Sequence, residues 1–315
     1  MKTISIIIPV HNEEDNVPLI YRALHDTWQD ISNYKYEFIF VDDGSTDSST
    51  KVMEALSKKD SQVKCIEFSR NFGKEMATTA GIDAAKGDAV IMIDADLQHP
   101  PHHIPQFIKA WESGAEVVVG VRTGNNGEGT VKKWGSVLFY RIMGAISETG
   151  FEKGETDFRL IDRCVVDAYK SFPEHERMTR SLINWLGFRR AKIFFEAPAR
   201  VNGTASYSTI KLVHLAVTSF LSHSLAPLRF TGYLGVGITG FAGILGVVVI
   251  IEKYILHDPF SWAVSASAQL AILIVFLVGI MLASIGIVGL YVGSIHTEVI
   301  KRPLYVVRRK SKASL

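Results

Sequence analysis

The sequence predicts an α/β domain, with a mostly parallel sheet flanked by helices, followed by an interfacial helix and two transmembrane helices. Five apolar, β-branched runs alternate with helical segments up to residue 122. Because consecutive parallel strands need helical crossovers, this alternation is typical of a doubly wound sheet. The second half instead holds two stretches without Asp, Glu, Lys or Arg, at residues 230–251 and 259–297. Each exceeds the roughly 20 apolar residues that cross a bilayer.

The predicted strands follow one another with a helix after each of the first four. The strands are expected at residues 3–10, 36–41, 63–68, 90–93 and 116–121. The helices are expected to end near Asp30, Lys58, the Ala-rich segment after Lys74, and Trp111. Thr46 or Asp47 is suited to cap the second helix, because both side chains accept backbone N–H groups. Residues 1–208 are therefore expected to form one layered domain.

Polar side chains follow every predicted strand, at the end where ligands bind in such sheets. The polar segments are His11–Glu13, Asp42–Asp43, Arg70–Lys74, Asp94–Gln98 and Arg122. In doubly wound sheets, ligands bind outside the carboxyl ends of the strands. The sequence therefore predicts a single site at that edge of the sheet.

Two carboxylates one residue apart, Asp94 and Asp96, follow a strand of four large apolar residues. Like charges this close repel unless a cation lies between them, and Mg²⁺ readily accepts carboxylate oxygens while keeping positions open for phosphate. The alternative is that Asp94 caps a turn and Asp96 is solvated, because Asp-x-Asp is a short and common motif. The two residues by themselves leave both interpretations open.

Composition and local motifs exclude several classes of protein. The turn after the first strand, Pro9–Glu14, is neither a dinucleotide-binding fingerprint nor a P-loop, which argues against NAD enzymes and P-loop ATPases. The first apolar run is too short for a signal peptide, and two cysteines provide no disulfide framework. We therefore expect the domain to stay in a reducing compartment, the cytoplasm.

Four motifs occur in an order that carries a family resemblance. They are Pro9–Glu14 (PVHNEE), Val41–Asp47 (VDDGSTD), Arg70–Lys74 (RNFGK) and Asp94–Pro100 (DADLQHP). In these motifs the chain resembles the family 2 glycosyltransferases with a GT-A fold, and within them the polyprenyl-phosphate glycosyltransferases. The resemblance covers essentially the whole chain and favours the metal interpretation of the two acids.

The resemblance implies roles for the residues at the strand ends. Nucleotide-sugar binding would involve Pro9, His11, Glu13, Asp43, Arg70, Gly73, Lys74 and Asp94, with Arg70–Lys74 bordering the base. The divalent metal, Mg²⁺ or Mn²⁺, would be held by Asp94, Asp96 and Gln98. The alternatives are an ordinary loop histidine at His11, a helix-capping turn at Asp42–Asp43, and a Gln98 that only braces its loop.

The segment Glu155–Arg163 resembles a family segment near the reacting centre. By this resemblance Asp157 is expected to be catalytic beside Asp96, either as a base or as the acid that orients the acceptor. Arg159 would contact phosphate or the scaffold. The acceptor phosphate is already largely anionic at neutral pH, since its second pKa is about 6, so a strong base is not required.

Arginines are the expected contacts of the acceptor phosphate. The resemblance assigns this role to Arg122 and Arg200, although Arg200–Tyr207 departs from the family pattern by lacking an acid and a lysine. Arg177 and Arg180 are three residues apart and hence on one helix face, where phosphate binding and simple solvation are both open.

The apolar half is expected to attach the protein to the membrane. Residues 209–228 are predicted as an interfacial amphipathic helix, 229–298 as a two-helix transmembrane hairpin and 299–315 as a basic cytoplasmic tail. The tail holds six Lys and Arg residues and no acid, so the positive-inside rule places both termini in the cytoplasm. A basic segment beside a span ordinarily faces lipid head groups, which argues against a nucleic-acid-binding arm. Glycines in both spans predict close helix pairing and a homo-oligomer.

Together these features predict a multi-pass enzyme of the plasma membrane. The expected reaction is the inverting transfer of a hexose, glucose from UDP-glucose as first choice, to a polyprenyl phosphate such as undecaprenyl phosphate on the cytoplasmic leaflet. GDP-mannose is the main alternative donor. A processive polysaccharide synthase is not favoured, because the chain has no Gln-x-x-Arg-Trp segment. A catalytically silent scaffold would have no need of the acidic motif.

Overall fold

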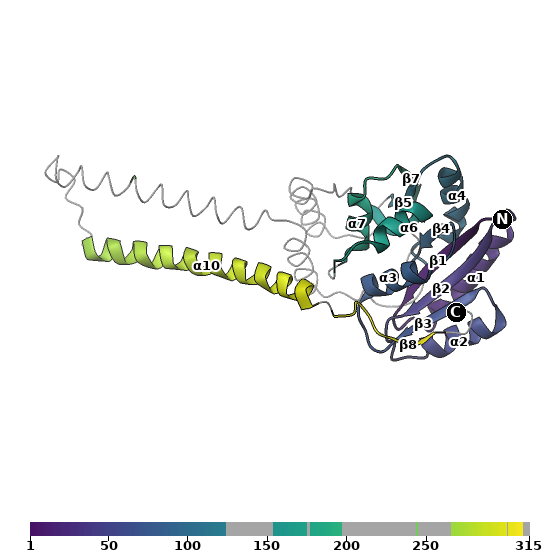
Figure 1. The fold of residues 1–315 in the computed structure, drawn as a ribbon, viewed down its shortest axis with the longest axis horizontal. Helices are drawn as coiled ribbons and strands as arrows, with labels where there is room; N and C mark the ends of the chain where they lie inside the picture. The colour runs from purple at the N-terminus through teal and green to yellow at the C-terminus, as the bar shows by residue number, and fades with distance from the viewer. Residues whose placement is uncertain (124–153, 175–176, 197–243, 245–265, 301, 311–315) are drawn as a thin grey trace. The chain divides into compact units, whose positions relative to one another are not determined.

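The computed structural model describes residues 1–123, 154–174, 177–196, 244, 266–300 and 302–310 (Figure 1). The chain divides into two compact units, Met1–Ser206 with Lys301–Leu315, and Tyr207–Ile300. Three predictions lie outside the described residues: Arg200, the interfacial helix at 209–228, and all of the first span except Ile244.

The first unit is built on a mixed sheet that has eight strands in the described residues. The strands are β1 (Thr3–Val10), β2 (Lys35–Asp42), β3 (Val63–Phe68), β4 (Ala89–Met92), β5 (Val117–Arg122), β6 (Glu155–Asp162), β7 (Arg190–Phe195) and β8 (Val307–Lys310). Their order across the sheet is β7-β5-β6-β4-β1-β2-β3-β8. The helices are α1 (Asn16–Gln29), α2 (Ser49–Lys59), α3 (Lys74–Ala84), the 3₁₀ helix η1 (Pro101–His103), α4 (Ile104–Glu112), α6 (Arg163–Lys170) and α7 (Thr179–Trp185).

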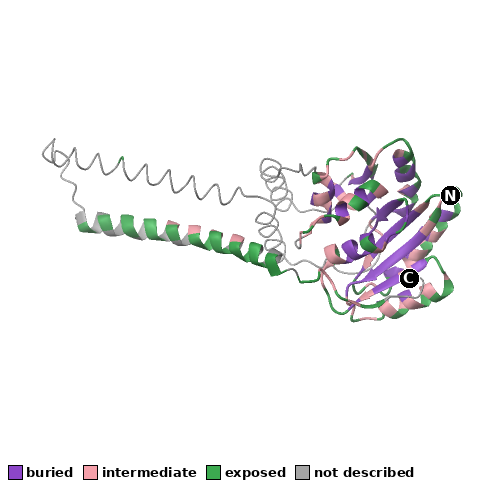
Figure 2. Cartoon of the chain, in the orientation of Figure 1, coloured by how far each residue is buried: buried purple, intermediate pink, exposed green. Residues whose placement is uncertain are grey.

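The centre of the sheet is the predicted parallel core. β1 pairs in parallel with β2 and β4, and β2 pairs in parallel with β3. Ile6 packs into an apolar cluster with side chains of α1 and α4, whereas Ile7 packs into a second cluster with side chains of α3 and α6. A strand buried on both faces needs apolar residues at successive positions, which explains why the β1 run does not alternate with polar residues. Figure 2 shows these central strands buried between the helical layers.

Strand β6 was not predicted, and it makes the sheet mixed. It lies between β4 and β5 and runs antiparallel to both, with Met92 opposite Arg159. β5 pairs on its other side with β7, in parallel. The two ends of the β5–β6 connection are held together, because the Arg122 N–H donates to the Gly154 carbonyl at 2.8 Å.

Four residues of the expected basic tail form β8 at the edge of the sheet. β8 pairs antiparallel with β3, and two of its arginines contact acids: Arg308 lies 3.3 Å from Glu67, and Arg309 lies 3.5 Å from Glu54. Without β8, β3 would expose a row of unpaired backbone N–H and C=O groups. These residues therefore belong to the sheet, whereas the sequence placed them in a tail facing lipid head groups.

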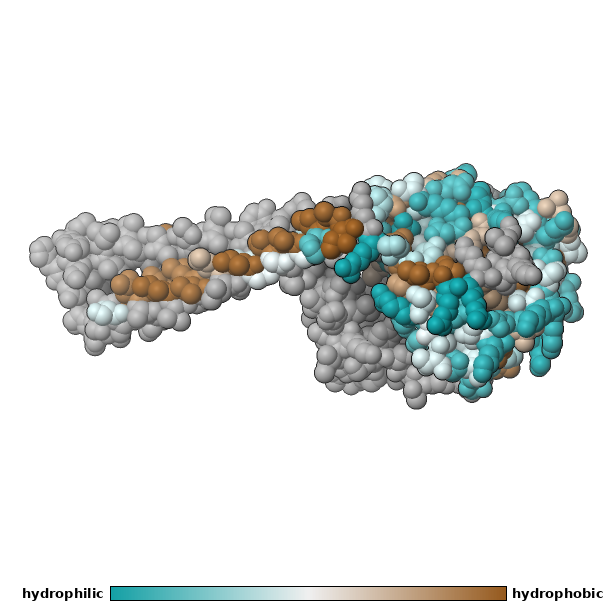
Figure 3. All heavy atoms as spheres, turned by 60° about the horizontal axis from the view of Figure 1, so that its bottom comes forward, coloured by the Kyte–Doolittle hydropathy of each residue, from teal (hydrophilic) through white to brown (hydrophobic). Residues whose placement is uncertain are grey.

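The described residues of the second unit are Ile244 and the 35-residue helix α10 (Ala266–Ile300). Exposed apolar side chains line α10, as Figure 3 shows in brown: Leu270, Ile274, Met281, Ile285, Val288, Val292, Ile295 and Val299. Among the helices that the structure describes, none has both the length and the apolar character needed to cross a membrane. The predicted second span overlaps α10, so the prediction of two spans has no support in the structure.

Candidate functional site

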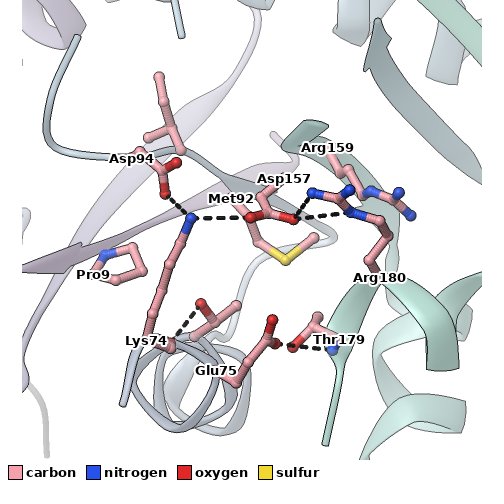
Figure 4. A pocket seen from close by; sticks show the side chains of 11 residues that line it. Pro9, Lys74, Glu75, Met92, Asp94, Asp157, Arg159, Thr179 and Arg180 are labelled. Atoms are coloured by element: carbon pink, nitrogen blue, oxygen red, sulfur yellow. Dashed lines mark hydrogen bonds and ion pairs between the residues drawn. The ribbon is translucent and has the colours of Figure 1, made fainter. Parts of the chain in front are cut away.

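Polar residues at the predicted edge of the sheet surround a pocket of the first unit (Figure 4). The pocket is lined by Pro9, Lys74, Glu75, Thr78, Met92, Ile93, Asp94, Asp157, Arg159, Thr179 and Arg180. It holds about 350 Å³, including its open mouth. Of the residues predicted to bind the nucleotide sugar, Pro9, Lys74 and Asp94 lie here, together with the predicted catalytic Asp157.

Asp94 and Asp157 reach the pocket from neighbouring strands of opposite direction. Asp94 follows Met92 by two residues, Asp157 precedes Arg159 by two, and Met92 is paired with Arg159. Because β4 and β6 are antiparallel, both acids come to the same edge of the sheet. The unpredicted strand β6 is therefore what brings the predicted catalytic acid to the site.

The ammonium group of Lys74 lies between these two acids. Its Nζ is 2.6 Å from Asp94 Oδ1 and 3.0 Å from Asp157 Oδ2. Arg180 Nη2 lies 2.8 Å from Asp157 Oδ1 on the far side, which completes a row of four charges in Figure 4. Lys74 is the first residue of α3, and its long side chain reaches both carboxylates. Its predicted place beside the nucleotide base stays a prediction.

These ion pairs keep both acid and amine charged. Burial alone would raise the pKa of Asp157, but Lys74 and Arg180 outweigh it and hold that pKa well below its usual range. Burial would also lower the pKa of Lys74, and the two carboxylates raise it instead. A carboxylate with such a low pKa accepts protons poorly at neutral pH. Asp157 is therefore better suited to orient cations around the pocket than to act as a general base.

Arg180 is a site residue that the sequence did not single out from its neighbour Arg177. α7 begins only at Thr179, and the Arg177 guanidinium donates to the carbonyl groups of Phe172 and Glu174. Arg180 and Asp157 are 23 positions apart in the chain, so no local spacing signals their contact. The shared helix face predicted for the two arginines is absent, because the first of them precedes the helix.

Arg159 serves the scaffold beneath the pocket. It is 1% exposed, and its Nη2 donates to Glu155 Oε2 at 3.1 Å while its Nη1 donates to Asn184 Oδ1 at 2.9 Å. Burial lowers the pKa of Arg159 to about 10. Of the two roles that the resemblance left open for this residue, the contacts support the scaffold role.

The Asp94–His99 turn is tightly braced. Leu97 adopts a left-handed φ of 61°, which is uncommon for a residue with a branched side chain. The Gln98 N–H donates to Asp96 Oδ1 at 3.1 Å, and the Asp94 N–H donates to His99 Nδ1 at 3.2 Å. Burial lowers the pKa of His99, which suits a neutral ring that accepts at Nδ1. The backbone N–H of Gln98 thus braces the loop, whereas the metal-binding role of its side chain stays a prediction.

The donor chemistry of Asp94 and Asp96 suits a hard divalent cation, since both present carboxylate oxygens. In the part of the chain that the structure describes, no group of three or more His, Cys, Asp and Glu side chains is arranged to hold a metal ion. Two carboxylates would leave the other positions of Mg²⁺ to water and phosphate oxygens, which is how this ion is commonly held. By donor chemistry the two residues fit a metal that is shared with a phosphate ligand, and of the two only Asp94 lines the pocket.

Asp43 holds the loop that leads into α3. Its carboxylate accepts the Phe72 N–H at 2.6 Å and the Gly73 N–H at 2.9 Å, and the residue is buried. Burial raises the pKa of Asp43, against the effect of these backbone donors. Asp42 instead accepts the Ser45 N–H at 2.9 Å in the turn before α2, whereas the N-cap residue of that helix is Ser48. Asp43 thus fixes the backbone of the loop immediately before Lys74.

His11 connects the same loops. Its Nδ1 lies 3.0 Å from the Asp43 carbonyl oxygen and its Nε2 lies 3.1 Å from Asn71 Nδ2. These contacts place the proton of a neutral ring on Nδ1, where it donates to the carbonyl. Glu13 Oε2 accepts from Asn16 Nδ2 at 2.5 Å at the start of α1. Both residues stabilise the loops at this edge and do not line the pocket.

Three further predicted residues, Arg70, Arg122 and Asp96, do not line the pocket. The Arg70 guanidinium lies 4.0 Å from the centroid of the Phe72 ring. Arg122 ends β5, and its buried Nε has no hydrogen-bond partner among the described residues. Asp96 is buried in the turn after β4 and does not line the pocket.

Comparison with known proteins shows which family has this fold and these residues. Residues 5–169, more than half of the chain, match the family described as Glycosyl transferase family 2. The chain belongs to glycosyl transferase family 2. The predicted resemblance is confirmed, and the protein is a glycosyltransferase with a GT-A, Rossmann-like fold.

Curated relatives of this glycosyltransferase match along nearly the whole chain. The SfII prophage-derived bactoprenol glucosyl transferase of Shigella flexneri is 34% identical over 311 residues, 99% of each chain. The prophage bactoprenol glucosyl transferase homolog of Escherichia coli (strain K12) is 35% identical over 309 residues, 98% of this chain and 99% of the relative.

A solved structure supports the fold of this glycosyltransferase. It is glucosyl-3-phosphoglycerate synthase from Mycobacterium tuberculosis, in complex with Mn²⁺, uridine diphosphate and phosphoglyceric acid. The TM-score is 0.50 at 18% identity, with 70% of this chain and 78% of that chain covered. At this identity the likeness concerns the fold alone.

Proposed function

We propose that this glycosyltransferase transfers one glucose from UDP-glucose to a polyprenyl phosphate, with undecaprenyl phosphate as the acceptor, and inverts the anomeric carbon. The observation that carries the proposal is that relatives 34% and 35% identical over nearly the whole chain are named bactoprenol glucosyl transferase and a homolog of it. The pocket supports the same chemistry, because it combines carboxylates suited to a metal with cations suited to phosphate groups.

The donor side of the proposed site is formed by Asp94, Asp96 and Lys74. Mg²⁺ or Mn²⁺ held by the two aspartates, with Gln98 nearby, would stabilise the charge that develops on the leaving nucleoside diphosphate. The Lys74 ammonium lies beside Asp94 and supplies a fixed positive charge for the same diphosphate. Pro9 lines the pocket together with Lys74 and Asp94.

The acceptor side is formed by Asp157 and arginines. The low pKa of Asp157 agrees with a reaction in which the lipid phosphate attacks as an anion and needs no strong base. Asp157 holds Lys74 and Arg180 in place from two sides. Arg180 lines the pocket, and we propose it as a phosphate contact in addition to the predicted Arg122 and Arg200.

We also propose that the protein acts at the cytoplasmic face of the plasma membrane, with both termini in the cytoplasm, as a homo-oligomer. The support is the continuous set of exposed apolar side chains along α10, a kind of surface that marks contact with lipid or with another protein. A lipid acceptor with an apolar tail fits this location. Fractionation of cells expressing the full chain tests it: the protein should sediment with membranes, and recovery in the soluble fraction alone would contradict the proposal.

Transfer of labelled glucose from UDP-glucose to undecaprenyl phosphate, in detergent with Mg²⁺, tests the proposed reaction. Asp96→Ala should abolish transfer, because it removes half of the proposed metal site. Asp88→Ala is the matched control: Asp88 precedes β4 and accepts the Thr3 N–H at 2.7 Å at the opposite end of the strands, so transfer should persist. Normal transfer by Asp96→Ala would show that the metal assignment is wrong.

A further inference from the structure

The segment that follows α10 in sequence contacts the loop at the nucleotide side of the site. We call Pro303–Lys310 the C-terminal strap and Ser69–Lys74 the 69–74 loop. The Ser69 N–H donates to the Val306 carbonyl at 2.9 Å, directly after the last pair of the β3–β8 ladder. The strap therefore fixes the point at which the 69–74 loop leaves the sheet.

Tyr305 is the side chain of the strap that contacts both elements flanking this loop. Its ring is stacked on Phe68, with centroids 5.0 Å apart and planes at 15°. Its hydroxyl donates to Asp83 Oδ2 at 2.9 Å, near the end of α3. Tyr305 thus holds together the strand before the loop and the helix after it.

Aromatic contacts extend from Tyr305 into the loop itself. Phe68 meets the Phe72 ring edge-on at 5.7 Å, and Phe72 carries the Arg70 guanidinium on its face. The backbone N–H groups of Phe72 and Gly73 are those that Asp43 accepts. The next residue is Lys74, whose ammonium lies between the two pocket acids. One continuous set of contacts therefore joins the strap to the pocket.

We propose that Tyr305 is a positioning residue for donor binding: through Phe68 and Asp83 it holds the 69–74 loop in the conformation that accepts the nucleotide sugar. The inference rests on the proposed function, in which Lys74, the last residue of this loop, lies beside the nucleoside diphosphate. Gly73 sits at a φ of 101°, so the loop conformation is one that few residues adopt by themselves. If the strap already holds the loop in this conformation, the free energy of ordering the loop is not subtracted from the free energy of donor binding.

The test separates positioning from plain stability by steady-state kinetics of the full chain in detergent. Tyr305→Ala should raise the KM for UDP-glucose about two- to tenfold, the range that one aromatic pair supplies. The kcat at saturating UDP-glucose should stay close to that of the wild type, because the bound donor then orders the loop. Tyr305→Phe keeps the stacked ring and should restore most of the KM. If Tyr305→Ala does not fold, Tyr305→Leu, which keeps an apolar side chain without the stacked plane, replaces it.

Tyr34→Ala is the matched control. Tyr34 also donates its hydroxyl to an acid, Glu112, and its ring contacts Trp111, but it precedes β2 at the opposite end of the strands. The Tyr34→Ala variant should have a lower Tm and an unchanged KM for UDP-glucose. An unchanged KM in Tyr305→Ala, or equal KM changes in both variants, would overturn the inference.

Calorimetry with UDP and Mg²⁺ distinguishes this failure from a failure of the proposed function. If the wild type binds UDP and Tyr305→Ala binds it with the same affinity, only the positioning role is refuted. No binding of UDP by the wild type refutes the proposed donor. The same pair of proteins is then compared with GDP, where a weaker affinity of Tyr305→Ala supports the positioning role and an equal affinity refutes it.

Discussion

Lys74→Met tests whether the ammonium between Asp94 and Asp157 serves catalysis rather than stability. The variant removes both ion pairs and keeps a side chain of similar length. The Lys74 side chain is 42% exposed and that of Asp157 is 35% exposed, so both pairs are screened by solvent. Their combined contribution is about 1 kcal/mol, which corresponds to a Tm lower by roughly 2 to 4 °C. The kcat should fall much further, about 100- to 1000-fold, because a positive charge beside the leaving diphosphate is lost.

Lys64→Met should show the opposite pattern, a large loss of stability without a loss of kcat. Lys64 pairs with Glu37, and their side chains are only 13% and 8% exposed. Removing one partner of a buried pair costs about 3 kcal/mol, so the Tm should fall by roughly 6 to 12 °C. The kcat of the folded variant should be unchanged, because this pair lies away from the pocket. Transfer assays and calorimetric melting of both variants give the comparison, and a Lys74→Met enzyme with wild-type kcat would refute the role of the ammonium.

Two further predictions concern the loop and the acid of the site. Gly44→Ala should weaken UDP binding and lower the Tm, because its Cβ would lie 2.4 Å from the Arg70 carbonyl carbon at a φ of 65°. Gly187→Ala, at a φ of 70° with nothing within 4 Å, should lower only the Tm. The Tm difference between wild type and Asp157→Asn should be constant from about pH 5 to 8 and shrink below about pH 4. The reason is that the folded pKa of Asp157 is depressed, so its contribution is lost as pH falls below the unfolded pKa. A Tm difference that grows in acid would contradict this assignment.

The parallel core could be predicted from the sequence because it is encoded locally. Apolar runs buried on both faces, such as β1, differ from the amphipathic helices between them. β6 could not be predicted in the same way. It contains the buried Arg159, which is stable there only because Glu155 and Asn184 contact it after folding. β8 consists of one valine and three basic residues, a composition typical of a solvated tail, and only the open edge of β3 makes it a strand.

The location of the site could also be predicted, but its internal contacts could not. Ligand sites lie at the carboxyl ends of parallel strands, so the gathering of polar residues at one edge follows from topology. The Lys74–Asp157 pair joins residues 83 positions apart, and it depends on the direction of the unpredicted β6. Asp43 and His11 belong to the sequence motifs, but the motifs do not indicate their contacts with the loops: Asp43 accepts the Phe72 and Gly73 N–H groups, and His11 contacts the Asp43 carbonyl.

The hydrogen bond between Arg122 and Gly154 has a consequence for which side chains position 122 can carry. The chain leaves β5 and enters β6 at one fixed point, on the edge of the sheet that carries Asp157. The bond is made by the backbone N–H of Arg122, so it does not depend on the side chain at this position. Replacement of the guanidinium therefore changes the charge at this edge of the sheet without shifting either strand.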